Sequence, residues 1–334
     1  MKDITADDIT VLPKPYGMSL SERQWLQISK VKDKDNSPYI DIDGLKLEIS
    51  NWKFPLHFID FETSTVAIPF NKGKKPYEQI AFQFSHHKIL EDGFISHETE
   101  YINSEAGSFP NFDFLRALRK ALSLDEGSIF KYSYHENTIL NAIYEQLITS
   151  NENDKEELID FIQSISHSKK ESAISWVGER DMIDLCEMVK LYYYNPQTKG
   201  SNSIKAVLPA VLNSSEYLKN KYSKSIKEIS LSSKNFKDDK VFIELDEKNE
   251  VISPYKSLPK LFEDWREEEL DNLISDLESL DNGGTALIAY SKLQFQEMND
   301  AERLEIKKAL LMYCELDTLA MVMIYEFFRD SINV

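Results

Sequence analysis

The stretch Leu56-His-Phe-Ile-Asp-Phe-Glu-Thr63 decides the fold, because it is a short apolar run that contains two carboxylates. Pro55 precedes it, and its residues favour β-structure, so it predicts a buried strand. Residues i and i+2 of a strand face the same side, so Asp60 and Glu62 are expected to point together. Such buried charges are costly unless they are neutralised. A divalent cation that prefers oxygen ligands, Mg²⁺ or Mn²⁺, would neutralise them.

A second motif lies near the end of the chain, where Tyr313 precedes Asp317 by one helical turn. Apolar residues recur in steps of three or four between Asn299 and about Phe328, which predicts a long final helix. Positions i and i+4 stack on one helix face, so the hydroxyl and the carboxylate should project side by side. Each motif alone also has a structural explanation. The strand acids could be bound by backbone amides or a lysine, and the helical pair could be a hydrogen bond at a packing boundary.

The pattern between and around these motifs alternates strands with helices, which predicts an α/β domain. Further strands are expected at 79–89, 95–102, 128–133 and 241–245, and helices at 112–122, 136–148, 152–166 and 181–194. An acidic helix is expected at 263–281, ending at Asn282-Gly283-Gly284, which is typical of a helix stop.

A chain of 334 residues holds one large domain or two modest ones. Residues 1–53 are polar and poorly periodic and are interpreted as an N-terminal extension or linker that can dock. Residues 54–330 are interpreted as one domain. An insertion is expected at 213–250, because 213–240 is rich in Ser and Lys and fits either a solvated loop or a helical insertion.

Charge and composition limit the function classes. The 39 basic and 57 acidic side chains give a net charge of −18, which repels phosphate backbones and anionic membranes. Cys186 and Cys314 are far apart, which excludes a disulfide framework and a cysteine-rich zinc site and predicts two small buried side chains. No apolar run approaches the roughly 18 residues of a membrane span. The acidic start is unlike a secretory signal, so a cytoplasmic protein without a membrane partner is expected.

Together the motifs resemble those of the DEDD, or DnaQ-like, 3′→5′ exonucleases of the ribonuclease H-like superfamily. The shared pattern is a D-x-E strand, an acid that opens a middle helix, and Y-x-x-x-D on the final helix. Within that group the chain is similar to the bacterial family called domain of unknown function 2779. The resemblance covers roughly residues 22–328 and is carried by PLHFIDFETSTVAIP, KKPYEQIAFQFSHH, DLCEMVKLYYYNPQTKGSNSIKAVLPAVL and YCELDTLAMVMIYEF.

The resemblance implies a mixed central sheet flanked by helices and a two-metal hydrolysis of DNA or RNA, with two Mg²⁺ or Mn²⁺ ions. It implies that Asp60, Glu62 and Asp317 ligate metal and that Tyr313 orients or deprotonates the attacking water. The superfamily's middle motif is Asn-x-x-x-Asp, and here Tyr132 and Glu136 replace both residues. Glu136 would be the fourth catalytic and metal-binding acid, and Asp184 is the reserve candidate.

Substrate contacts are expected from the residues around this acidic site. The candidates are Thr63, Lys74, Lys75, Lys199 and Lys205. A basic rim would let phosphates approach, although solvated surface lysines would look the same in the sequence. The expected partner is nucleic acid with single-stranded 3′ ends, and the resemblance leaves room for a separate nuclease or helicase partner.

Two other functions fit the same residues. The altered middle motif and the net charge favour a catalytically weakened nuclease-like module that binds nucleic acid or regulates a repair or defence system. A phosphodiesterase for short or nucleotide-sized substrates would tolerate the acidic surface better than an enzyme for long polymers.

Overall fold

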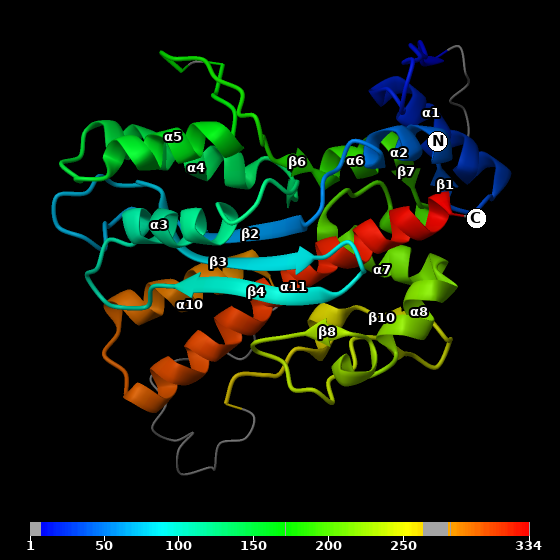
Figure 1. Cartoon of the computed structure of the whole chain (residues 1–334). Helices are drawn as coiled ribbons and strands as arrows, with labels where there is room; N and C mark the ends of the chain where they lie inside the picture. Colours follow the sequence, from blue (N-terminus) through cyan, green and yellow to red (C-terminus); the bar gives the residue numbers. More distant parts are fainter. Residues whose placement is uncertain (1–7, 171, 263–279, 281, 334) are drawn as a thin grey trace.

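The computed structural model describes residues 8–170, 172–262, 280 and 282–333, and its centre is a mixed sheet in the strand order β6-β5-β2-β3-β4-β8 (Figure 1). Strands β2, β3 and β4 form an antiparallel meander, while β5 pairs parallel to β2, β6 to β5, and β8 to β4. The bounds are β2 Leu56–Ser64, β3 Ile80–Ile89, β4 Ile95–Ile102, β5 Ile129–Lys131, β6 Ile183–Asp184 and β8 Leu231–Ser232. The predicted α/β class with a mixed central sheet flanked by helices is confirmed.

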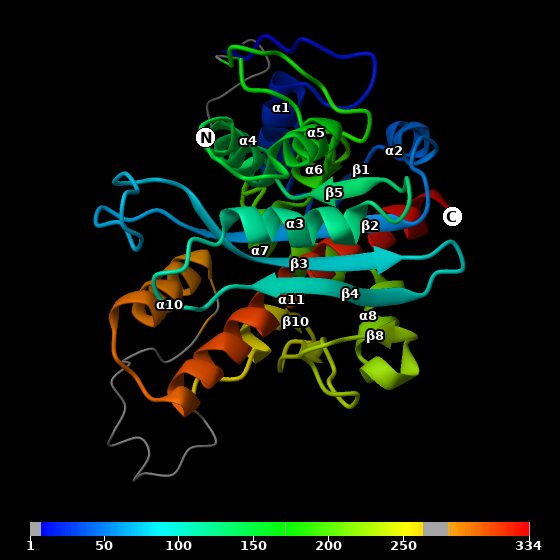
Figure 2. The same ribbon diagram turned by 60° about the vertical axis from the view of Figure 1, so that its left-hand side comes forward.

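Helices cover both faces of this sheet (Figures 1 and 2). One hydrophobic core lies between the sheet and three helices: α3 (Asn111–Leu122), α4 (His135–Ile148) and α5 (Lys155–Ile165). The other core lies on the opposite face, beneath α6 (Leu185–Tyr192), α7 (Ile204–Ser214), α8 (Glu216–Tyr222), α10 (Gly283–Phe295) and α11 (Asp300–Ile332). Alternate residues of β2 enter the two cores: Phe58 packs on the α11 side, and Ile59 and Phe61 pack on the α3 side. The same alternation turns Asp60 and Glu62 toward α11.

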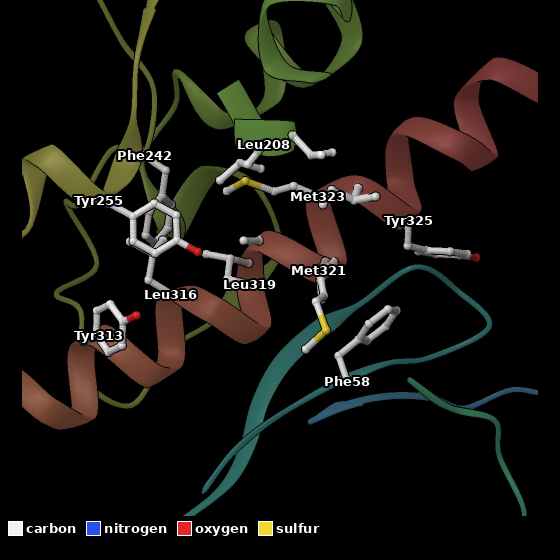
Figure 3. Close-up of a cluster of buried hydrophobic side chains, with 14 of the residues drawn as sticks. Phe58, Leu208, Phe242, Tyr255, Tyr313, Leu316, Leu319, Met321, Met323 and Tyr325 are labelled. Atoms are coloured by element: carbon white, nitrogen blue, oxygen red, sulfur yellow. The ribbon is translucent and has the colours of Figure 1, made fainter. Parts of the chain in front are cut away.

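The final helix, α11, is enclosed by the rest of the molecule. Every residue from Tyr313 to Phe328 is buried, including the carboxylates of Glu315, Asp317 and Glu326. Figure 3 shows side chains of α11, among them Leu319 and Met321, between Phe58 of β2 and Leu208 of α7. None of the described helices combines the length and apolar character needed to cross a bilayer. The predicted final helix is confirmed, and its packing fixes the position of its polar residues relative to β2.

The predicted helix 181–194 is wrong at both ends. Ile183 and Asp184 form β6, and α6 begins only at Leu185, because the Asp184 side chain caps it by accepting hydrogen bonds from the backbone of Cys186 and Glu187. The last residues of the predicted helix form β7 (Tyr193–Tyr194), which pairs with β1 (Tyr39–Ile40). Strand pairing with a distant segment therefore overrides the local helical pattern.

The glycine pair after residue 282 also differs from its prediction. Asn282 accepts a hydrogen bond from the backbone N–H of Thr285, so it caps the start of α10, and Gly283 and Gly284 open this helix instead of ending one. The predicted helix 263–281 lies outside the described residues apart from Leu280. The expected insertion at 213–250 holds α8, the 3₁₀ turn Ile226–Glu228, β8 and β9 (Glu244–Leu245). β8 joins the edge of the central sheet, and β9 pairs with β10 (Val251–Ile252), which directly follows the insertion. The predicted strand 241–245 is therefore reduced to β9 and an isolated bridge at Val241.

Residues 8–53 pack on the domain. The segment contains α1 (Leu20–Asp33), which begins at a capping box of Ser19 and Glu22, and α2 (Ile42–Ile49). Arg23 is buried, and its Nη1 donates to the carbonyl oxygen of Tyr193 at 2.7 Å and to that of Val189 at 3.3 Å. These bonds attach α1 to the end of α6.

Replacing Arg23 with methionine is expected to lower the free energy of unfolding by about 2 kcal/mol, because it leaves buried carbonyl acceptors without a donor. Urea unfolding followed by circular dichroism measures this change. Arg119→Met is the matched control, since that side chain is 41% exposed and pairs with Glu157 at the surface. The control should shift the free energy by less than about 0.5 kcal/mol. Equal unfolding midpoints for Arg23→Met and the wild type would contradict the prediction.

Candidate metal-binding and active site

A cavity of about 330 Å³ opens where β2 meets α11. Elements from distant parts of the chain contribute its walls: β2, the β5–α4 connection with the first residue of α4, and helices α7, α10 and α11. The lining residues are Asp60, Phe61, Glu62, Thr63, Tyr132, His135, Ile204, Lys205, Gly283, Leu287, Tyr313 and Asp317. The fold therefore brings Asp60, Glu62, Tyr313 and Asp317, which the sequence singled out, to one cavity.

The two carboxylates of β2 lie close to other acids. Burial raises the pKa of Asp60 and of Glu62 well above the usual range, and the nearby charge of Asp317 raises both further. The thiol of Cys314 donates to Asp60 Oδ2 across 3.6 Å. One donor atom from each of Asp60, Glu62 and Cys314 can be chosen so that all three lie within 4.8 Å of one another. Buried, mutually repelling carboxylates of this kind suit a divalent cation.

Asp317 is held by two tyrosines. The Tyr255 hydroxyl donates to Asp317 Oδ1 at 2.5 Å. Burial raises the pKa of Asp317, while the charge of Lys205 and hydrogen bonds from Tyr255 and Tyr313 lower it. The expected side-by-side placement of Tyr313 and Asp317 is therefore present. Tyr255 lies on the 3₁₀ turn Pro254–Ser257, and no spacing in the sequence relates it to the other site residues.

A hydrogen bond from Lys205 holds the hydroxyl of Tyr313 in place. Lys205 Nζ donates to the Tyr313 hydroxyl at 2.6 Å and lies 4.7 Å from the centre of the Tyr313 ring and 5.0 Å from that of Tyr255. Burial and the charge of Asp317 raise the pKa of Tyr313 far above its usual value. The phenol therefore keeps its proton, which suits orienting a water molecule and does not suit removing a proton from one.

Glu136 does not share the cavity with the other three acids, although its charge raises the pKa of both Asp60 and Glu62. It lies in the first turn of α4, is 1% exposed and does not line the cavity. Burial raises its pKa to about 8, and a hydrogen bond with the backbone of Phe61, between Asp60 and Glu62, opposes that shift. Its Oε2 atom has no hydrogen-bond partner among the described residues. The structure thus places the expected fourth acid beside β2 and behind the cavity wall.

Asp184, the reserve candidate, has a structural role. Its carboxylate accepts hydrogen bonds from the backbone N–H of Ser133 at 2.9 Å and of Cys186 at 2.8 Å, and from Lys131 Nζ at 3.2 Å. It does not line the cavity. Capping α6 and joining it to β5 accounts for this acid.

The expected substrate contacts separate into two groups. Thr63 and Lys205 line the cavity, and the Thr63 hydroxyl lies 3.1 Å from Nε2 of His135, a cavity residue that sequence reasoning missed although it directly precedes Glu136. Lys74, Lys75 and Lys199 do not line it. Lys74 pairs with Glu78 and lies over the ring of Phe109, and the other two side chains are exposed.

Replacing Glu136 with glutamine is expected to stabilise the metal-free protein at high pH. Below pH 4.5 the carboxyl is protonated in both the folded and the unfolded chain, so wild type and variant should be similarly stable. As the pH rises to about 8 the unfolded wild type releases this proton and the folded chain retains it, so the wild type loses stability relative to the variant. The difference should reach a plateau on the order of 5 kcal/mol above that pH.

Urea unfolding in a chelating buffer between pH 4 and 9 measures the difference. Glu145→Gln is the control, because Glu145 is an exposed residue of the same helix. A Glu136→Gln variant that is less stable than the wild type at every pH would show that the ionised carboxylate stabilises the fold.

Part of the chain matches a known family model. The family described as Domain of unknown function (DUF2779) matches residues 57–203. Searches of curated proteins and of solved structures gave no match. The matched part contains Asp60, Glu62 and Glu136, while Tyr313 and Asp317 follow it in the sequence. The match supports the resemblance of residues 57–203 to the DUF2779 family, a family of domains of unknown function.

Proposed function

We propose that this protein is a metal-dependent 3′→5′ exonuclease with a ribonuclease H-like fold, which hydrolyses phosphodiester bonds of DNA or RNA. One observation carries the proposal: Asp60 and Glu62 from β2 and Asp317 from α11 converge on one cavity. The burial and mutual repulsion of these acids would be relieved by cations. The mixed sheet with helices on both faces is compatible with the proposed fold.

The donor set fits Mg²⁺ or Mn²⁺, because both prefer carboxylate oxygens. Asp60, Glu62 and Asp317 would hold two such ions, with Glu136 behind them. When bound, the ions would supply a nucleophile at neutral pH and stabilise charge on the leaving 3′ oxygen.

The chain's other cavity residues would act on substrate and water. Tyr313 keeps its proton and would orient the attacking water. Lys205 would hold the Tyr313 hydroxyl in place, and its positive charge offsets locally the net charge of −18. Tyr255 would fix the position of the Asp317 carboxylate.

The experiment uses the full chain and single-stranded DNA, single-stranded RNA and duplex DNA, each labelled at the 5′ end, with Mg²⁺, Mn²⁺ or a chelator. The expected result is stepwise shortening from the 3′ end that needs a metal and is lost in Asp60→Asn. Cleavage that persists in the chelator or in Asp60→Asn would contradict the metal site. Failure to degrade any substrate would contradict the nuclease.

Two outcomes would instead favour the alternatives. Metal-dependent binding of oligonucleotides without cleavage would indicate a nucleic-acid-binding or regulatory module, for which the position of Glu136 behind the cavity wall is the supporting observation. Turnover of dinucleotides without turnover of oligomers would indicate a phosphodiesterase for short substrates.

A further inference from the structure

A thiol lies at the base of the carboxylate site. Cys314 follows Tyr313 on α11, is fully buried, and places Sγ 3.6 Å from Asp60 Oδ2 and 3.7 Å from the Asp60 carbonyl oxygen. A zinc ion bonds sulfur at about 2.3 Å and oxygen at about 2.0 Å, so in a tetrahedral site the two donors are about 3.5 Å apart. The separation of Cys314 Sγ and Asp60 Oδ2 matches this value. A carboxylate oxygen of Glu62 lies within 4.8 Å of a ligand atom of Asp60 and of Cys314 Sγ.

We propose that Asp60, Glu62 and Cys314 form a mixed carboxylate–thiolate site for a thiophilic divalent cation of the zinc class. The site shares two acids with the proposed Mg²⁺ or Mn²⁺ site, and to that extent the inference rests on the proposed function. As the sulfur–metal bond forms, the thiol proton passes to solvent. No electron is transferred.

A buried acid beside the cluster has one oxygen without a hydrogen-bond partner among the described residues, and this is a separate observation that points to a cation. Glu136 is 1% exposed, its Oε2 has no partner among the described residues, and its carboxyl bonds the backbone of Phe61, the residue between Asp60 and Glu62. A cation among these donors would compensate the charge on three neighbouring carboxylates, of which Glu62 and Glu136 are buried. Asp60 and Glu62 line the cavity and Cys314 does not, so an ion entering from the cavity would meet oxygen first and sulfur at the base.

Sulfur changes which metal the site prefers. Mg²⁺ takes oxygen ligands in octahedral geometry, whereas thiolate favours Zn²⁺ and its neighbours. Zn²⁺ is therefore expected to bind in competition with Mg²⁺ and to inhibit Mg²⁺-supported hydrolysis. Cys186 differs, because its thiol is also buried but donates to the carbonyl oxygen of Asn202 and belongs to no cluster of metal-ligating side chains found among the described residues.

The test adds CoCl₂ to the reduced full chain and records the ultraviolet charge-transfer band that a thiolate–cobalt bond produces. The band is expected in the wild type and in Cys186→Ser, and it should disappear in Cys314→Ser and when ZnCl₂ is added to the wild type. Calorimetric titration with ZnCl₂ should show affinity reduced on the order of tenfold or more in Cys314→Ser and unchanged in Cys186→Ser. Cys314→Ala, with circular dichroism of each variant, separates ligand loss from misfolding. Asp60→Asn supplies a further variant that keeps the thiol and is expected to weaken cobalt binding.

Three results would overturn the inference: absence of the band in the wild type, its persistence in folded Cys314→Ser or Cys314→Ala, or its loss in Cys186→Ser. The same experiments distinguish failure of this metal site from failure of the proposed nuclease activity. A thiolate band in a protein that cleaves no substrate would support this site and contradict the nuclease. Metal-dependent cleavage by a wild-type protein that gives no band would support the nuclease and contradict this site.

Discussion

Replacing Asp317 with asparagine is expected to lower Mg²⁺- or Mn²⁺-dependent hydrolysis of a labelled oligonucleotide by about a thousandfold, because the loss of one anionic ligand removes several kcal/mol of charge stabilisation. The variant should fold. An asparagine side-chain oxygen can still accept the hydrogen bonds of Tyr255 and Tyr313, and one of the repelling charges disappears. Initial rates at saturating metal, compared with those of the wild type, measure the effect.

Asp330→Asn is the matched control for this prediction. It makes the same substitution on the same helix, near the C-terminal end of α11 and away from the cavity lining. Its rate should stay within about twofold of the wild-type rate, since surface substitutions have small effects. A fully active Asp317→Asn, or an equal loss in Asp330→Asn, would show that Asp317 has no special part in catalysis.

Periodicity predicts the parts of the site that lie within one element. Strand alternation places Asp60 and Glu62 on one side of β2, and the structure has them opposite the side of Ile59 and Phe61. Helical spacing in the same way pairs Tyr313 with Asp317 on α11. Both regularities depend on backbone geometry alone, so they can be deduced without knowing the tertiary fold.

Contacts between distant elements carry no such signal. Tyr255 reaches Asp317 from a segment 62 residues earlier in the chain, on a short 3₁₀ turn without periodicity. β8 is only two residues long and lies in a Ser- and Lys-rich stretch, yet it pairs with Ile95 at the sheet edge. Such contacts depend on how distant elements pack together, which no local pattern in the sequence specifies. The sequence predicts Cys314 as a small buried side chain, which is confirmed, but not its position beside Asp60.

Local signals can also point to the wrong element when a side chain has a capping role. Asp184 continues an apolar helical pattern in the sequence, but its carboxylate binds the N-terminal backbone of α6 and leaves the preceding residues to β6. Glu136 does open a helix as predicted. Its burial beside Phe61 depends on how α4 packs against β2, which no pattern within α4 specifies.

Lys205→Met is expected to lower kcat about a hundredfold, because a misplaced catalytic group has an effect of this size. Lys205 acts on two partners: it donates to Tyr313 at 2.6 Å, and its charge opposes the raised pKa of Asp317. Tyr313→Phe removes the hydroxyl that Lys205 positions and should reduce kcat to a similar extent. Lys120→Met, an exposed residue of α3 on the opposite face of the sheet, is the control and should leave kcat unchanged.

The double variant distinguishes a positioning role for Lys205 from direct binding of substrate. If Lys205 acts through the Tyr313 hydroxyl, the combined loss in kcat should be close to that of either single variant, because the second change removes an interaction already lost. If Lys205 instead binds a phosphate of the substrate independently, the two losses should multiply, and Lys205→Met should raise KM more than it lowers kcat. The hydrogen bond between the lysine and the tyrosine favours the first result, and multiplicative losses would contradict it.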